Sequence, residues 1–368
     1  MKPADVVIVG AGVIGAAIAY TLSRCTNLRI VVVERGTPGC EASNAAAGVL
    51  AVANGRARRG VLLDLRRRSA AMFPELVAAL ESETGIDLGY QTAGLLSLAL
   101  SDSAAAALRD LVGLRAEQGM RSEMLSGTEV RSLEPALHPA VGAAAHFPED
   151  RAIHSANFVA ALVAAARKRG GEFRLNTPVR SLRRTNGDVT LDLHGETLHA
   201  GRVVVAAGAW SGELADRPGI KVPVRPARGE MAAVRATTWQ LRHVLAAGNT
   251  YIVPRQDGTV AIGSTMAFVG FDKRVTESGV GTLLAQAAQL LPDVRQAEVC
   301  GTWAGLRPCS TIRRPIIAPL PGLEQVILAT GHHRNGILLA PITAQLVTEL
   351  ITGATPSVPL RPLSYRRH

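Results

Sequence analysis

Three glycines and an acid near the start of the chain have the spacing of a site for a nucleotide diphosphate. Gly10, Gly12 and Gly15 follow one apolar stretch, and Glu34 follows a second one, residues 28–33. In such a motif the first glycine permits a tight turn, the second lets the backbone approach a pyrophosphate, and the third lets the helix pack closely on the strand. The diphosphate then lies at the N-terminus of that helix.

An acid at the end of the second strand accepts hydrogen bonds from ribose hydroxyls. Glu34 therefore favours FAD or NAD over NADP, because its carboxylate would repel a 2′-phosphate, although the adjacent Arg35 weakens this preference. The order of strand, glycines, helix, strand and acid over residues 5–34 predicts a dinucleotide-binding βαβ unit. The alternative interpretation is a buried strand followed by an alanine-rich core helix.

Three further segments indicate that the dinucleotide is a flavin. Residues 41–50 contain mostly small side chains, as a backbone lying against a flat ring requires. Residues 301–308 supply a cation, Arg307. Residues 329–341 combine a strand end, a basic loop and a helix start, and such a loop can direct backbone N–H groups at the flavin pyrimidine ring, where reduction builds negative charge.

The middle of the chain predicts the elements that hold these segments in place. Ser155 is the expected N-cap of a helix over residues 156–169. Alternating segments separated by turn residues, among them Asn186 and Gly187, predict a three-stranded meander over residues 179–200. Residues 202–211 read as a strand that ends in small residues, and we expect it to be the last strand of the parallel nucleotide sheet.

Antiparallel material is interspersed among these pieces. Residues 94–100 predict one strand, and residues 250–255 predict a hairpin with residues 259–263. The fold class is therefore α/β: an FAD-binding Rossmann-like domain with a β-meander, plus an α+β substrate domain with a mainly antiparallel sheet. The predicted FAD-binding domain comprises residues 1–85, 151–222 and 300–368, and the substrate-binding domain comprises residues 86–150 and 223–299.

Composition agrees with a folded two-domain enzyme. The 368 residues are 47% hydrophobic and 19% charged, which excludes a disordered chain. The net charge of +10 comes largely from arginine, including the runs at residues 56–59, 66–68 and 366–367. These runs lack interleaved aromatic residues, so we interpret them as solvated surface and expect no nucleic-acid partner.

The remaining composition signals concern membranes, metals and location. Residues 6–22 are apolar enough to imitate a membrane or signal helix, but their glycines belong to the nucleotide motif, so we expect no integral membrane segment and a cytoplasmic protein. The four cysteines show neither CxxC nor zinc spacing, so no metal site and no disulfide framework are expected.

Residues 251–255, 303–308 and 331–341 resemble motifs of the glycine oxidase and D-amino acid oxidase family of FAD enzymes, and within it the glycine oxidases of thiamine biosynthesis. The resemblance runs nearly end to end. It implies that Arg307 pairs with the substrate carboxylate, that Tyr251 adds a hydroxyl contact, and that Arg334 lies at the substrate end of the flavin. With the glycine motif, it predicts these FAD-binding residues: Gly10, Gly12, Val13, Ile14, Gly15, Glu34, Arg35, Ala42, Ser43, Ala47, Gly48, Val49, Val179, Gly305, His332, His333, Arg334, Asn335, Gly336, Ile337 and Leu338.

Two positions depart from the pattern of relatives. His333 stands where an aromatic residue is frequent in relatives. The resemblance therefore does not predict the shape of the entrance to the substrate site. Cys309 directly follows Arg307 and Pro308, where the sarcosine oxidases that resemble this family have a cysteine bonded to the flavin. We favour the interpretation of Cys309 as a small buried loop residue, with FAD held non-covalently.

The resemblance also implies the reaction. The neutral amine of glycine, sarcosine or a small D-amino acid would pass a hydride from Cα to the flavin, and O2 would reoxidise the flavin and give H2O2. No motif residue stands out as a general base, so no catalytic residue is predicted beyond the binding groups. The expected partners are the amino acid and O2, with self-association into a homo-oligomer left open. The alternatives are a D-amino acid or opine dehydrogenase that passes electrons to a quinone, and a flavin-binding subunit of a multi-subunit amine dehydrogenase.

Overall fold

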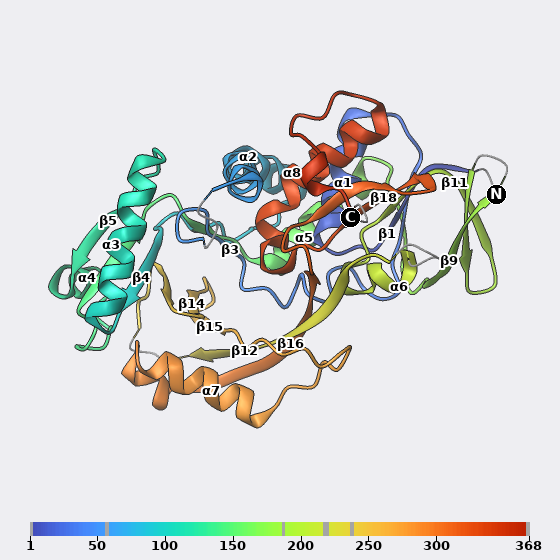
Figure 1. Ribbon diagram of the computed structural model, residues 1–368. Coiled ribbons are helices and arrows are strands. Elements are labelled where there is room, and N and C mark those ends of the chain that lie inside the picture. Colours follow the sequence, from blue (N-terminus) through green and yellow to red (C-terminus); the bar gives the residue numbers. More distant parts are fainter. Residues whose placement is uncertain (1–2, 56–58, 186–187, 216–220, 236–238, 366–368) are drawn as a thin grey trace.

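The computed structural model describes residues 3–55, 59–185, 188–215, 221–235 and 239–365. Within these residues the chain forms two sheets of eight strands each and one two-stranded pair. Figure 1 shows the first sheet on the side of the N-terminus and the second sheet curving below and away from it, so that the molecule is elongated. Each sheet takes strands from distant parts of the sequence, and the fold is mixed α/β as predicted.

The first sheet has a parallel centre. Its strands are β1 (Ala4–Val9), β2 (Ile30–Val33), β8 (Glu172–Arg174), β9 (Val179–Thr185), β10 (Asp188–Leu193), β11 (Thr197–Val205), β17 (Ile316–Leu320) and β18 (Leu323–Thr330). The order is β17-β18-β11-β1-β2-β8, with β10 and β9 continuing from β11 as an antiparallel meander. Strands β1 and β2 are almost continuously apolar, and nearly all their side chains are buried, as is typical of parallel strands covered on both faces.

Four helices pack together, and two of them, α1 and α8, contact strands of this sheet: α1 (Val13–Cys25), α2 (Val61–Thr84), α5 (Ser155–Lys168) and α8 (Gly336–Thr352). Figure 1 shows them grouped beside β1 and β18. The close approach of α1 depends on Gly15, because a Cβ at that residue would lie 1.9 Å from the carbonyl oxygen of Gly10. The glycine spacing therefore fixes the helix N-terminus directly beyond the end of β1, as the sequence predicts.

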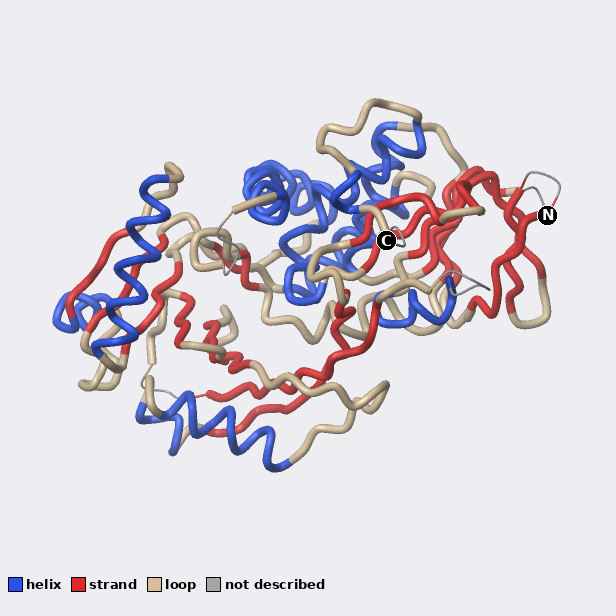
Figure 2. Tube along the Cα trace, in the orientation of Figure 1, coloured by secondary structure: helices blue, strands red, loops and turns tan. Residues whose placement is uncertain are grey.

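The second sheet is mainly antiparallel. Its strands are β4 (Leu95–Ala99), β5 (Glu123–Ser126), β6 (Ala143–Phe147), β12 (Val224–Arg235), β13 (Val244–Ala247), β14 (Thr250–Pro254), β15 (Thr259–Gly263) and β16 (Glu298–Ser310). They lie in the order β16-β12-β15-β14-β13-β4-β6-β5, and only β13 and β4 among adjacent strands are parallel within the described chain. Figure 2 shows the long pair β12 and β16 extending beneath the molecule, with helix α7 (Glu277–Ala288) along its outer side.

The smaller elements complete the two layers. Helices α3 (Asp102–Glu117) and α4 (Gly127–Leu133) pack at the far end of the second sheet, and β3 and β7 form the two-stranded pair. The bounds of the others are β3 (Val49–Leu50), β7 (Arg151–Ala152), α6 (Ser211–Ala215), η1 (Gly208–Trp210), η2 (Pro292–Arg295), η3 (His333–Asn335) and η4 (Arg361–Leu363).

Several sequence expectations differ from the structure in detail. Residues 197–205 form one strand, β11, whose first half pairs with β10 and whose second half pairs in parallel with β1. Strand β18 lies parallel beyond β11, so β11 is not the last strand of the parallel sheet. The N-cap of α5 is His154, whose ring accepts from the Asn157 amide, because the Ser155 hydroxyl donates to the Ala46 carbonyl instead. The turn at residues 186–187 lies outside the described residues.

The arginine runs are not uniformly exposed to solvent, although the sequence analysis expected them to be. Arg66, on α2, is only 8% exposed and donates to the Asn335 side chain at 2.8 Å. Arg67 and Arg68 beside it are exposed, as expected. The reason is that α2 turns one face toward α8, and three consecutive residues of a helix point in different directions. Residues 56–58 and 366–368 lie outside the described residues.

The strands divide between the sheets largely along the predicted domain segments. We propose the two predicted domains with one change to their boundary. Strand β16 pairs with β12 over almost its whole length, whereas the predicted boundary at residue 300 assigned most of it to the FAD-binding domain. Counting residues 298–310 with the substrate domain places every strand of the second sheet in one unit.

Residues 333–352 are the one helical stretch in the described chain that is long and apolar enough to cross a membrane by length and composition. More than half of its most apolar window, 56%, is buried. The side chains of α8 pack against α1 and α2, which is the behaviour of a core helix.

Candidate active site where the two sheets meet

A cavity of about 480 Å³ lies between the carboxyl ends of the parallel strands and the strands β12, β14 and β16. This is the expected position for a ligand in an open α/β sheet. It brings together most of the predicted residues, whose side chains or backbone form its wall: Gly10, Gly12, Val13, Ile14, Glu34, Arg35, Ala42, Ser43, Ala47, Gly48, Val49, Val179, Tyr251, Gly305, Arg307, His332, His333, Arg334, Gly336 and Ile337.

Three predicted cofactor residues are not part of the wall, each for a packing reason. Gly15 lies in the first turn of α1, where a Cβ would meet the carbonyl of Gly10. Asn335 turns its amide oxygen toward Arg66, and Leu338, on α8, is 2% exposed in the core. These residues therefore support the cavity from behind.

The nucleotide end of the cavity is formed by the turn between β1 and α1. Gly10 has φ +104°, and Gly12 is the N-cap of α1. The first turn of α1 has no acidic residue, and the Gly12 cap has no side-chain hydrogen bond, so its positive end is available to an anion. The Ser43 hydroxyl accepts from the Val13 amide at 2.9 Å, which brings residues 41–50 against this helix start.

Glu34 holds this turn in place as well as facing the cavity. One carboxylate oxygen accepts from the Ala11 amide at 2.7 Å, and the other accepts from the Gly36 amide at 2.9 Å. The side chain is nearly buried, at 8% exposed. The acid is thus fixed where a ribose hydroxyl would reach it, and it also ties the glycine turn to the end of β2.

Trp210 and Lys273, which the sequence analysis did not select, lie beside Arg35 and Glu41 at this end. The Arg35 guanidinium lies 3.5 Å from the centre of the Trp210 ring and pairs with Glu41 at 2.6 Å. Lys273 pairs with the second oxygen of Glu41 at 2.8 Å. The only signal in the sequence was an aromatic residue just beyond a strand end, which by itself is too common to select Trp210.

Small residues form the middle of the wall, where a flat ring would lie. Gly48 has φ +85°, and a Cβ there would lie 1.8 Å from the Ile153 carbonyl oxygen. A Cβ at Gly305 would lie 2.6 Å from the Ala45 Cβ. This cradle, the helix N-terminus and the ribose acid together fit a flavin dinucleotide in both shape and charge.

At the other end of the cavity, Arg307 presents a cation that has no acidic partner within the described chain. One guanidinium nitrogen donates to the Thr265 carbonyl at 3.0 Å, and another donates to the Ser264 hydroxyl at 2.6 Å. A Cβ at Gly229 on the paired strand would lie 2.0 Å from the guanidinium, so glycine makes the space for it. Both anchors are neutral, which leaves the positive charge for an external carboxylate.

The other predicted substrate residues lie on the same cavity. The Tyr251 hydroxyl donates to the Met231 sulfur at 3.4 Å, and Arg334 donates to the Met266 sulfur at 3.8 Å. His333, at φ +52°, also faces the cavity. Burial, followed by the charges of Arg334 and Arg307, lowers the pKa of His333 to about 4, so this imidazole is neutral and weakly basic at neutral pH.

Cys309 lies on strand β16 and is only half-buried, so the expectation of a small buried loop residue is wrong. It is not part of the cavity wall, although Pro308 before it is. Its backbone forms an isolated bridge to His332. No group of metal-binding side chains occurs among the described residues.

The sequence matches the family described as DAO, FAD dependent oxidoreductase, over residues 5–350. The chain belongs to this family. The family is FAD-dependent, so FAD is the cofactor of this chain.

The DAO-family relatives include glycine oxidase of Geobacillus kaustophilus, 37% identical over 366 residues, which are 99% of this chain and 97% of the relative. The bifunctional protein ThiO/ThiG of Trichormus variabilis is 33% identical, over 94% of this chain and 52% of the relative. The crystal structure of glycine oxidase from Geobacillus kaustophilus superposes with a TM-score of 0.96 at 36% identity and covers 100% of both chains.

Gly229→Ala tests how Arg307 is accommodated. The new Cβ would overlap the guanidinium, which is the mobile end of a long side chain, so the fold should survive while the cation moves. We expect the KM for a small amino acid to rise at least tenfold, because a charge-assisted hydrogen bond contributes about 1.5–3 kcal/mol. Gly301→Ala on the neighbouring strand, where a Cβ meets nothing within 4 Å, is the control and should leave KM unchanged.

His332 predicts a pH dependence of stability. Burial lowers its pKa from 6.5 to about 3, so the folded protein keeps the ring neutral, whereas the unfolded chain protonates it below 6.5. The stability from this neutral ring is complete above pH 6.5 and is lost as the pH falls toward 3, at about 1.4 kcal/mol per unit. His332→Gln should reduce the slope of unfolding free energy against pH by that amount between pH 6 and 5.

Proposed function

We propose that the protein is an FAD-dependent oxidase of small amino acids, of the glycine oxidase type. It would oxidise glycine, and also sarcosine and small D-amino acids, to the imine, with O2 as electron acceptor and H2O2 as product. The observation that carries this proposal is the Arg307 guanidinium, which lies on the cavity wall between two neutral anchors and without an acidic partner among the described residues. Likeness to glycine oxidases over the whole chain supports it.

The protein's own part in this reaction is to bind and orient the substrate. Arg307 would hold the carboxylate by two parallel hydrogen bonds, and the Tyr251 hydroxyl would add a third contact. Arg307 and Arg334 both add positive charge at this end of the cavity, which favours the neutral amine over the ammonium form. His333 is neutral and therefore does not offset the positive charge of the two arginines. FAD, when bound, supplies the redox chemistry by taking a hydride from the amino acid Cα and delivering electrons to O2.

The site-residue roles are part of the same proposal. Glu34 and the N-terminus of α1 would hold the ribose and the diphosphate, and the segment from Ala42 to Val49 would lie along the ring system. The loop from His332 to Ile337, together with the start of α8, would meet the pyrimidine end.

The test is anaerobic mixing of the purified protein with glycine, sarcosine, D-proline, D-alanine or L-alanine while flavin absorbance is recorded. We expect glycine, sarcosine and the D-amino acids to bleach the flavin to graded extents, because a methylene or two changes the binding free energy by only about 1–3 kcal/mol. Equal bleaching by L-alanine and D-alanine would contradict an orientation fixed by Arg307.

Two further outcomes separate the alternatives. Bleaching without steady H2O2 production in air would indicate a dehydrogenase that passes electrons to a quinone. Tight FAD binding without bleaching by any of the five amines would indicate a flavin-binding subunit that requires another chain. Both would replace the oxidase proposal.

We also propose which pathway consumes the product and in which compartment the protein works. The relatives named bifunctional ThiO/ThiG protein join a chain similar to this one to a second part, so the imine formed here would be consumed in the synthesis of the thiamine thiazole. The four cysteines are all unpaired and three of them are exposed, which suits the reducing cytoplasm.

A further inference from the structure

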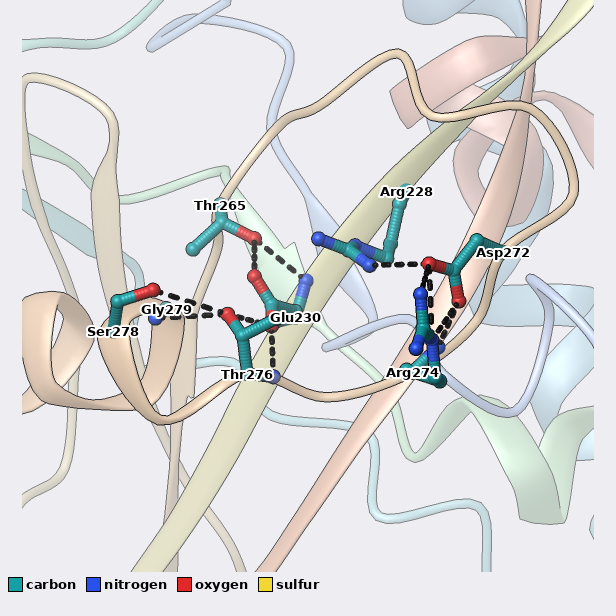
Figure 3. Close-up of polar contacts among 8 residues, drawn as sticks. All are labelled: Arg228, Glu230, Thr265, Asp272, Arg274, Thr276, Ser278 and Gly279. Carbon is teal, nitrogen blue, oxygen red and sulfur yellow. Dashed lines mark hydrogen bonds and ion pairs between the residues drawn. The ribbon is translucent and has the colours of Figure 1, made fainter.

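The loop between β15 and α7, residues 264–276, connects Arg307 with a buried acid. Figure 3 shows the acid, Glu230, held between Thr265 at the start of this loop and Thr276 at its end. Glu230 lies on β12 next to Gly229, the residue that makes space for the Arg307 guanidinium. It is only 3% exposed. A carboxylate buried this deeply is costly unless every oxygen is hydrogen-bonded.

Both oxygens of Glu230 accept from the loop. One accepts from the Thr276 amide at 2.6 Å and from the Thr276 hydroxyl at 2.8 Å. The other accepts from the Thr265 hydroxyl at 2.9 Å, and the Glu230 amide donates back to that hydroxyl at 2.9 Å. Thr265 is therefore fixed by a reciprocal pair of hydrogen bonds, which leaves its side chain little rotational freedom.

The same residue, Thr265, is one of the two anchors of Arg307. Its carbonyl oxygen accepts from the guanidinium at 3.0 Å, and the adjacent Ser264 hydroxyl accepts at 2.6 Å. The chain of contacts thus runs from the Glu230 carboxylate through the Thr265 hydroxyl and backbone to Arg307. A displacement of Thr265 would move both acceptors that set the direction of the guanidinium.

The surroundings keep Glu230 in its ionised form. Burial acts to raise the pKa of its carboxyl group, but hydrogen bonds from Thr276 and Thr265 outweigh burial, and the pKa lies below the ordinary value. Gly279 in the first turn of α7 brings the helix N-terminus close, since a Cβ there would lie 2.2 Å from a Glu230 oxygen. Nearby Arg228 pairs with Asp272 instead of with Glu230, as Figure 3 shows.

We propose that Glu230 is a positioning residue for the substrate: through Thr265 it holds the Arg307 guanidinium in the direction that receives the substrate carboxylate. This inference rests on the proposed role of Arg307. Glu230 acts without touching substrate or flavin, because it is not part of the cavity wall. Its effect is therefore confined to the orientation of the carboxylate site.

The experiment measures the dissociation constant of acetate, a carboxylate that cannot be oxidised as an amine, from the change it causes in the flavin absorbance spectrum. Glu230→Gln and Thr265→Val interrupt the contact chain, whereas Thr265→Ser keeps the hydroxyl. Arg274→Ala is the matched control, because Arg274 lies on the same loop with an 86% exposed side chain and is paired with Asp272, not with Glu230 or Thr265. FAD content and melting temperature are recorded for every variant.

We expect acetate to bind about tenfold more weakly to Glu230→Gln and Thr265→Val, and normally to Thr265→Ser and Arg274→Ala, at unchanged FAD content. The KM for glycine should rise in parallel, with kcat changing less. A lower melting temperature with normal acetate affinity would overturn the proposal in favour of a purely structural role. If Glu230→Gln does not fold, the two Thr265 variants decide by the same criterion.

A double-variant comparison separates this inference from the function on which it rests. If Glu230 acts through Arg307, Glu230→Gln should weaken acetate binding no further when Arg307 is already alanine. An additional loss in that background would overturn the positioning role. If Arg307→Ala alone leaves acetate binding unchanged, the proposed role of Arg307 fails and this inference fails with it. If Arg307→Ala weakens binding and Thr265→Val does not, only the inference fails.

Discussion

Arg307→Ala is expected to remove most of the catalytic efficiency on glycine while the protein remains yellow. The guanidinium is held by the neutral Ser264 hydroxyl and Thr265 carbonyl, so its charge is directed at the substrate. Removing it would leave a desolvated carboxylate without a partner, which costs on the order of 2–5 kcal/mol. Steady-state kinetics should show this loss in kcat/KM, and the flavin spectrum should show that FAD is retained.

Arg307→Lys is the matched comparison. Lysine keeps the charge but presents a single ammonium group, which cannot make the two parallel hydrogen bonds of a guanidinium. It should therefore restore only part of the lost efficiency. Parent-like kcat/KM in Arg307→Ala would exclude the carboxylate role, and full activity in Arg307→Lys would show that charge alone is sufficient.

The local parts of the fold were predictable because each follows from residues close together in sequence. The glycine spacing, the apolar strands and the acid predicted β1, α1 and β2, and turn residues predicted the hairpin of β14 and β15. Strand β16 was harder to assign to a domain. In the structure it pairs with β12 of the second sheet, but in sequence it leads into the segment that returns to the first sheet. Local pattern therefore does not reveal which sheet it joins.

The site residues likewise divide into those with a local sequence signal and those brought in by long-range strand pairing. Arg307, Tyr251 and Arg334 stand in local motifs, and the structure brings them to one cavity. The groups that hold Arg307 have no local signal, since Gly229 and Thr265 reach it only because β12 pairs with both β15 and β16. Single-sequence reasoning could not connect residues that are 42 to 78 positions apart (307 − 265 and 307 − 229).

A similar limit explains the arginine that was expected to be solvated. Arg66 belongs to a run of three, and charge runs usually lie on exposed faces. Its burial follows from the contact between α2 and α8, and its donation to Asn335 turns that residue away from the cavity. The burial of Arg66 therefore depends on a long-range helix contact that the charge run does not reveal.

Gly15→Ala is expected to have the largest effect on the FAD-binding domain. The new Cβ would lie 1.9 Å from the carbonyl oxygen of Gly10, an atom of the backbone that cannot turn aside as a flexible side chain can. Helix α1 would have to move away from β1, and α1 packs on both α5 and α8. Overpacking of this kind costs about 3 kcal/mol.

The same displacement should release the cofactor, because α1 presents its N-terminus at Gly12 and Val13 to the nucleotide end of the cavity. We expect Gly15→Ala to purify largely without FAD and to melt at a lower temperature. Added FAD should restore little of the lost stability, because a ligand stabilises a fold only as far as it binds. Gly113→Ala, in the exposed helix α3 where a Cβ meets nothing within 4 Å, is the control and should raise stability slightly. Normal FAD content and melting temperature in Gly15→Ala would mean that α1 and the glycine turn are not packed as closely as the cavity requires.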